Sequence, residues 1–115
     1  MPHMHEALRA YGTVTTGRSR GEQEADIFHR ANGALRAARG SGLTRQVRAL
    51  ADNRRLWDTV LGLVYDPASG LPLPLRAAIV SVGLSVQREL SRETPNFDFL
   101  IAVNENIAAG LARRA

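Results

Sequence analysis

The chain lacks cysteine and lysine altogether and contains few aromatic residues. The absence of cysteine among its 115 residues excludes disulfides, thiolate metal sites and cysteine nucleophiles. Aromatic residues make up 5% of the chain, and the apolar residues are mostly Leu, Val and Ala, which favours helices over a β-sandwich. No apolar run approaches the ~20 residues of a membrane-spanning helix, and the N-terminus lacks the pattern of a secretory signal. These absences predict a soluble, cytoplasmic protein with no membrane partner.

All fifteen basic residues are arginine, and the formal net charge is +4. Arginine stays charged near neutrality, so the isoelectric point is higher than this modest excess of charge implies. GC-rich coding accounts equally well for the use of arginine in place of lysine. The basic composition alone is therefore weak evidence for nucleic-acid binding.

The hydrophobic pattern predicts an all-α protein, a compact four-helix bundle with a short N-terminal arm. Residues 1–18 have no sustained period and are expected to form the arm, with Tyr11 and Val14 as apolar anchors; the first few residues carry little weight in this prediction. Residues 19–115 are assigned to a single helical domain. Its four amphipathic helices are expected at about 20–39, 43–65, 74–92 and 95–113.

Capping and turn residues mark where these helices begin and end. Ser19 and Glu22 have the spacing of a capping box, and the Gly40–Gly42 segment ends the first helix. A cluster of turn formers at 66–70 ends the second helix. Thr94 is the expected N-cap of the last helix.

Each helix has one apolar face. The first is expected to bury Ile27, Phe28, Ala31, Ala34, Leu35 and Ala38. On the second, Leu43, Leu50, Trp57, Leu61 and Val64 lie on one line, widened by Leu56, Val60 and Leu63. The third carries Leu75, Ile79, Val82, Val86 and Leu90, and the fourth carries Phe97, Leu100, Ile101, Ile107, Ala108 and Leu111.

Polar residues interrupt the apolar face of the second helix. Arg55 projects to solvent, whereas Arg54 lies at the border and is expected to pair with Asp58, one turn later. Asn53 projects into the apolar arc, and Asn104 does the same on the fourth helix. A buried amide without partners costs about 1–3 kcal/mol, so both should be hydrogen-bonded. They either set the register of the bundle, bind the backbone of the arm, or line a groove for a partner.

The sequence contains no recognisable catalytic, metal or cofactor constellation. His3 and His5 lie near the terminus, and His29 falls on a polar face. The carboxylates do not converge, and Ser81 and Ser85 have no histidine nearby in the sequence. The glycines form neither a phosphate loop nor a dinucleotide fingerprint. We therefore expect no enzyme activity, no cofactor and no metal site.

Apolar side chains also occur outside the main helical stripes. In a small domain, such second faces usually contact another helix, here from a partner. The alternative is that they pack under the arm or form a homodimer. The residues expected to bind a partner are Tyr11, Val14, Asn53, Leu56, Leu63, Val80, Leu84, Phe99 and Asn104.

The order of several short motifs resembles the FlaF family of flagellar biosynthesis regulators. The matching blocks cover nearly the whole chain, and none is very specific by itself. They are Ala10-Tyr11-Gly12, Arg20-Gly-Glu-Gln-Glu24-Ala25, Asn53-Arg-Arg-Leu-Trp57, Leu75-Arg76-Ala77 with Ile79, Leu100-Ile-Ala-Val-Asn104, Ile107-Ala and Gly110-Leu111.

This resemblance implies a non-enzymatic cytoplasmic protein that promotes flagellin synthesis and export as a chaperone-like partner of flagellin. It also implies work beside a second regulator, FlbT, which is a further candidate partner. An amphipathic flagellin segment would fold onto the exposed apolar faces, and the arm would cover the same groove when flagellin is absent. Leu63→Asp and Leu84→Asp are then expected to weaken flagellin binding.

Two other functions remain open at the level of sequence. One is an RNA-binding post-transcriptional regulator that uses the arginines near the first helix–helix corner, namely Arg36, Arg39, Arg45, Arg48 and Arg55. Against direct nucleic-acid binding stand the missing reading motif, the few aromatics and the interleaved acids. The other is a dimerising bundle without a flagellar role; the sequence leaves the oligomeric state undetermined.

Overall fold

The computed structural model describes residues 19–113, and within them every long element is a helix. In chain order these are α2 (Arg20–Ala38), α3 (Leu43–Val64), the short 3-10 helix η1 (Pro67–Ser69), α4 (Leu73–Leu90) and α5 (Phe97–Ala112). The expected all-α bundle is confirmed, with helix ends within about two residues of those predicted. The arm, with Tyr11 and Val14, lies outside the described residues.

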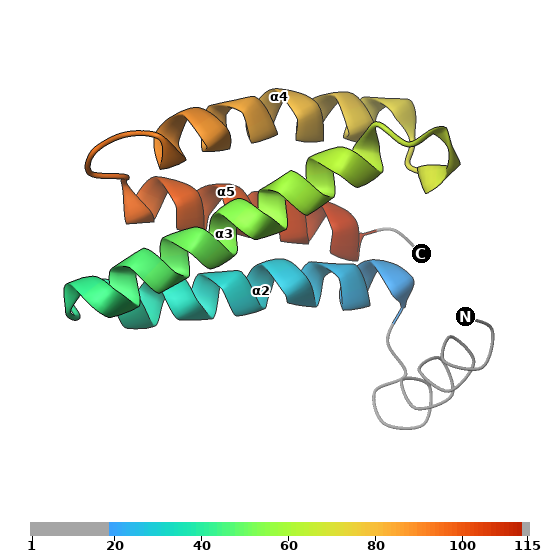
Figure 1. The fold of residues 1–115 in the computed structure, drawn as a ribbon. Coiled ribbons are helices and arrows are strands. Elements are labelled where there is room, and N and C mark those ends of the chain that lie inside the picture. The colour runs from blue at the N-terminus through green and yellow to red at the C-terminus, as the bar shows by residue number, and fades with distance from the viewer. Residues whose placement is uncertain (1–18, 114–115) are drawn as a thin grey trace, which may run out of the picture.

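The long helices form a closed ring in which each contacts two others. The contacting pairs are α2–α5, α5–α4, α4–α3 and α3–α2, and the α2–α5 pair is the most extensive. Neighbouring helices run in opposite directions, and α3 crosses the bundle obliquely (Figure 1). Short antiparallel connections are typical of such up-and-down bundles.

The N-terminus of α2 is defined by a complete capping box. The Oγ of Ser19 accepts a hydrogen bond from the backbone N–H of Glu22 over 3.1 Å, and Glu22 Oε1 accepts from the N–H of Ser19 over 3.0 Å. At the other end, Gly40 takes a positive φ of 81° after the helix ends. Both features follow the sequence prediction, because a serine–glutamate pair and a left-handed glycine satisfy the unpaired groups of helix termini.

The N-terminus of α5 differs from the prediction. Asn96, not Thr94, is the N-cap, and its Oδ1 accepts a hydrogen bond from the N–H of Phe99 over 3.0 Å. The backbone N–H of Asn96 in turn donates to Glu89 Oε2 over 2.8 Å, which ties the α4–α5 connection to the end of α4. Thr94 was the wrong choice because Pro95 still belongs to the connection, and asparagine caps a helix at least as well as threonine.

The core centres on Trp57, the single tryptophan, which is fully buried. Its ring packs edge to face against Phe28 of α2, with ring centroids 5.7 Å apart. One turn further along α3, Leu61 lies so close to Gly83 of α4 that a Cβ at Gly83 would come within 2.7 Å of a Leu61 methyl group. Glycine at this position therefore allows α3 and α4 to approach one another.

Two apolar residues expected in the core are on the surface instead. Ile27 is 50% exposed and Leu43 is 75% exposed. The buried residues of α2 are Gly21, Ala25, Phe28, Asn32, Leu35 and Ala38. This stripe is rotated relative to the predicted one, because Asn32 takes a core position and each residue turns the helix by about 100°. Leu43 stands at the first turn of α3, where no other helix covers it.

The expected ion pair between Arg54 and Asp58 does not form. Arg54 Nη2 instead donates to the carbonyl oxygen of Leu90 over 2.7 Å, while Asp58 Oδ1 accepts from Gln87 Nε2 over 3.2 Å. The C-terminus of α4 offers Arg54 an unpaired carbonyl with a partial negative charge. Arg55 is exposed, as predicted, with Asp52 at 4.0 Å.

Candidate functional site

A cluster of three asparagines lies in the centre of the bundle. Asn104 of α5 donates through Nδ2 to Asn32 Oδ1 over 2.9 Å and to Asn53 Oδ1 over 2.8 Å. Its Oδ1 accepts the indole N–H of Trp57 over 2.9 Å. All three asparagines have no exposed surface. Asn104 therefore uses every hydrogen-bonding group of its amide to connect α2, α3 and α5.

The other two amides are satisfied unequally. Asn32 Nδ2 donates to the carbonyl oxygen of Ile101 over 3.0 Å, which adds a second link between α2 and α5. The buried Nδ2 of Asn53 has no hydrogen-bond partner. Asn53 and Asn104 thus bond to each other inside the core, and neither lines the groove described below. Asn32 was missed, although its position four residues after Phe28 and three before Leu35 places it in the same stripe.

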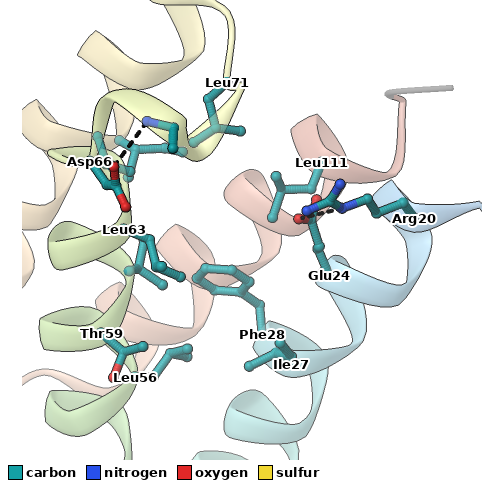
Figure 2. Close-up of a pocket in the computed structure, with 14 residues that line it drawn as sticks. Arg20, Glu24, Ile27, Phe28, Leu56, Thr59, Leu63, Asp66, Leu71 and Leu111 are labelled. Carbon is teal, nitrogen blue, oxygen red and sulfur yellow. Dashed lines mark hydrogen bonds and ion pairs between the residues drawn. The ribbon is translucent and has the colours of Figure 1, made fainter. Parts of the chain in front are cut away.

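An apolar groove opens where α3 diverges from α2 (Figure 2). Its volume is about 390 Å³. Its floor consists of the buried Phe28, Val64, Ile79 and Leu111. Its walls carry apolar side chains that remain accessible, namely Ile27, Leu56, Val60, Leu63 and Leu71. Every long helix contributes a residue to this groove.

Polar residues occur only around the rim of the α2–α3 groove. Arg20 Nε lies 3.7 Å from Glu24 Oε2 on the α2 side. On the α3 side, Thr59 Oγ1 donates to the carbonyl of Arg55 over 2.9 Å, and Asp66 Oδ1 accepts from the N–H of Ala68 over 2.9 Å. These groups are engaged locally, and the walls between them are hydrocarbon. Such a surface suits an apolar side-chain ligand better than a reacting substrate.

The family model for flagellar protein FlaF matches residues 7–111 of this sequence. The chain belongs to the FlaF family. Neither a curated protein nor a solved structure matches it.

Two of the blocks that carry the resemblance to FlaF meet in the core. The first, residues 53–57, contributes Asn53 and Trp57; the second, residues 100–104, contributes Asn104. All three side chains belong to the same hydrogen-bonded cluster. These two blocks of the resemblance to FlaF therefore contribute the hydrogen bonds that join α3 to α5.

The residues expected to bind a partner do not form one surface in this FlaF-family chain. Leu56 and Leu63 line the α2–α3 groove, whereas Val80, Leu84 and Phe99 do not. Val80 packs against the core, Leu84 of α4 is 51% exposed and Phe99 of α5 is 37% exposed. The sequence did not indicate Ile27 and Leu71 as groove residues. The position of Ile27 at the edge of the apolar stripe of α2 is the signal that could have indicated it.

The arginines near the α2–α3 corner are partly neutralised. Arg36 forms an ion pair with Glu105, and Arg39 forms one with Asp98, so α5 supplies a carboxylate to each. Arg45 and Arg48 are exposed and border a shallow depression lined mainly by alanines. No continuous unpaired basic surface results from the set proposed for RNA binding.

Within residues 19–113, no group of three histidine, aspartate or glutamate side chains is placed to hold a metal ion. His29 is exposed, as predicted, and His3 and His5 lie outside the described residues. Among the helices of the described chain, none has the length and apolar character needed to cross a bilayer.

Proposed function

We propose that this FlaF-family protein binds an amphipathic segment of flagellin in the α2–α3 groove, and thereby promotes flagellin synthesis and export. The binding would take place in the cytoplasm, before flagellin is exported, and would require no catalysis. The observation that carries the proposal is the groove itself, because it presents accessible apolar walls over an apolar floor in a protein of a flagellar family.

The accessible side chains supply the binding energy in this proposal. Ile27 is 50% exposed and Leu63 is 58% exposed, and they stand on opposite walls. Burial of a complete side chain of this size contributes about 1.5–3 kcal/mol, so covering the exposed halves of both contributes about 2 kcal/mol together. Helical ligands are held in this way by side chains spaced three and four residues apart.

Isothermal titration calorimetry with flagellin tests the groove. We expect Leu63→Asp and Ile27→Asp each to weaken binding at least tenfold, which corresponds to about 1.4 kcal/mol. Val47→Asp is the matched control, because Val47 also lies on α3 and is 56% exposed but does not line the groove. Far-UV circular dichroism should show the same helix content in all three variants.

Two results would count against this placement. Equal affinity of the Leu63→Asp, Ile27→Asp and wild-type proteins for flagellin would show that the binding surface lies outside the groove. A loss of binding in Leu84→Asp alone would show that flagellin binds to the exposed face of α4. Failure of the wild-type protein to bind flagellin at all would contradict the proposed function.

A further inference from the structure

A second hollow lies on the same face of the molecule as the α2–α3 groove. It is the shallow depression of about 230 Å³ between alanines of α2 and the side chains of Arg45 and Arg48 of α3. Asp52 lines this depression, and Leu56, one turn later on the same side of α3, already lines the groove. The two hollows therefore follow one another along the seam between α2 and α3, which lie side by side (Figure 1).

Three arginines along this seam have no carboxylate partner within residues 19–113. Arg45 and Arg48 border the depression, and both are exposed. Arg30 of α2 is also exposed and lies between the two hollows. It follows Ile27 of the groove by three residues and precedes Ala34 of the depression by four, so all three share one side of the helix.

The carboxylates of the seam already have neighbours of opposite charge. At the groove, Glu24 lies 3.7 Å from Arg20. At the depression, Asp52 is the one carboxylate among the lining residues, and it lies 4.0 Å from Arg55. The seam is therefore mainly apolar at the groove and positively charged at the depression.

This distribution fits an amphipathic helix with an acidic end. The alanines of the depression allow a second helix to lie close, because small side chains shorten the distance between helix axes. From Leu56 back to Arg48 is eight residues of α3, or about 12 Å, so the acidic residues stand about two turns beyond the apolar ones. The depression has no aromatic side chain on which a base can stack, which favours carboxylates over a nucleic acid.

We infer that the segment bound in the α2–α3 groove is an amphipathic helix with an acidic end, whose carboxylates pair with Arg30, Arg45 and Arg48. The inference rests on the proposed function for the identity of the ligand as flagellin, whereas the chemistry of the ligand follows from the seam. Complementary charges steer association and fix the register of a complex. An apolar groove accepts a helix in either direction, and the arginines at one end of the seam select a single direction.

Synthetic peptides test this chemistry without flagellin. Three helical peptides of about 20 residues share one apolar stripe. They carry two glutamates two turns beyond one end of the stripe, two glutamates beyond the other end, or lysines at both places. We expect one glutamate peptide to bind the full-length protein at least about ten times more tightly than the lysine peptide, as measured by fluorescence anisotropy at low salt. Arg45→Glu/Arg48→Glu should abolish this preference. Equal affinities, no binding of either glutamate peptide, or a preference that survives the double substitution would overturn the inference.

Isothermal titration calorimetry with flagellin tests the same arginines in the proposed complex. We expect Arg45→Glu and Arg48→Glu each to weaken binding by about three to ten times. Arg88→Glu is the matched control, because it makes the same change of charge at an exposed position of α4, which does not contact α2. Urea unfolding should show no loss of stability in Arg45→Glu, since an acidic residue in the first turn of α3 suits the helix dipole.

Failure of the inference and failure of the proposed function give different results. If flagellin does not bind but a glutamate peptide binds through Arg45 and Arg48, the proposed function fails and the inference stands. If Leu63→Asp abolishes flagellin binding while Arg45→Glu and Arg48→Glu leave it unchanged, the inference fails and the proposed function stands. If a single-stranded RNA binds at low salt and is lost in Arg45→Glu/Arg48→Glu, while the glutamate peptides do not bind, the arginines serve a nucleic acid and the inference is wrong.

Discussion

The indole Nε1 of Trp57 donates a hydrogen bond to Oδ1 of Asn104 over 2.9 Å in the middle of the bundle. The bond joins α3 to α5, which have no close backbone contact with each other. A polar bond in a dry core has one specific geometry, whereas apolar contacts tolerate sliding. We propose that this bond and those of Asn104 to Asn32 and Asn53 set the relative register of the helices.

Replacement of Asn104 is predicted to be the most destabilising change in this cluster. Asn104→Leu leaves the Trp57 N–H and the Oδ1 atoms of Asn32 and Asn53 without their observed partner. At about 1–3 kcal/mol for each buried unpaired group, we expect a loss of about 3 kcal/mol or more in the free energy of unfolding. Urea denaturation followed by far-UV circular dichroism measures this loss.

Asn53→Leu is the matched comparison for Asn104→Leu. It leaves one N–H of Asn104 unpaired but also removes the Asn53 Nδ2 that has no partner in the folded protein. We expect it to cost about 1 kcal/mol or less. Equal losses for the two variants would show that the network does not depend on Asn104 in particular.

The burial of Asn53 and Asn104 could be predicted from the sequence, but their relationship could not. Helical periodicity places both residues among apolar neighbours, and the need for a partner follows from the cost of burying an amide. Which amide meets which depends on the pairing of α2 with α5, the first and last helices of the described chain. No local pattern encodes that choice, although the spacing of Asn32 from Phe28 and Leu35 does indicate its burial.

The groove was less predictable than the helices. Capping residues and periodicity located the helix ends to within about two residues, because those signals are local. The groove arises from the oblique course of α3, whose C-terminal end lies away from α2. Leu63 near that end is exposed, whereas Ala49 near the other end of α3 is buried. Such an angle depends on packing at positions such as Gly83 and Leu61, on elements far apart in the chain.

Two glycines on neighbouring helices are predicted to respond to alanine in opposite directions. At Gly83, a Cβ would lie 2.7 Å from Leu61 Cδ2 and 3.1 Å from its Cγ. Leu61 is buried, and moving its methyl groups alone does not relieve the contact with Cγ. We expect the overpacking cost of about 1–3 kcal/mol to exceed the ~1 kcal/mol gained in helix propensity. Gly83→Ala should therefore lower the melting temperature.

Gly62→Ala provides the control for this prediction. Apart from its chain neighbours and the nearby backbone of α3 itself, no atom lies within 4 Å of a Cβ at Gly62, so only the gain in helix propensity operates. We expect an increase of about 0.5–1 kcal/mol in the free energy of unfolding. Thermal unfolding of both variants under the same conditions decides the matter. Stabilisation of the protein by Gly83→Ala would show that α3 and α4 separate without cost.

The bond from Arg54 to the end of α4 predicts unequal roles for two residues that the sequence suggested as a pair. Arg54→Leu removes a charge-assisted hydrogen bond to the Leu90 carbonyl, and we expect a loss of about 1 kcal/mol. Asp58→Ala removes only an exposed hydrogen bond with Gln87, and we expect less than about 0.5 kcal/mol. Denaturant unfolding of both single variants measures the difference. If the two single variants lose equal amounts and their effects are not additive in a double-mutant cycle, Arg54 and Asp58 form a direct ion pair after all.

The pairing of the corner arginines predicts that this protein does not bind RNA through them. Arg36 and Arg39 already have carboxylate partners on α5, so binding a phosphate there requires breaking an ion pair as well as releasing counterions. We expect fluorescence anisotropy with a labelled single-stranded RNA to show no binding tighter than about 10⁻⁴ M at low salt. The contrary result would be micromolar binding that weakens steeply with salt and is lost in Arg45→Ala/Arg48→Ala, the two exposed arginines of that corner. That outcome would place a second, electrostatic surface at the end of the bundle opposite the groove mouth.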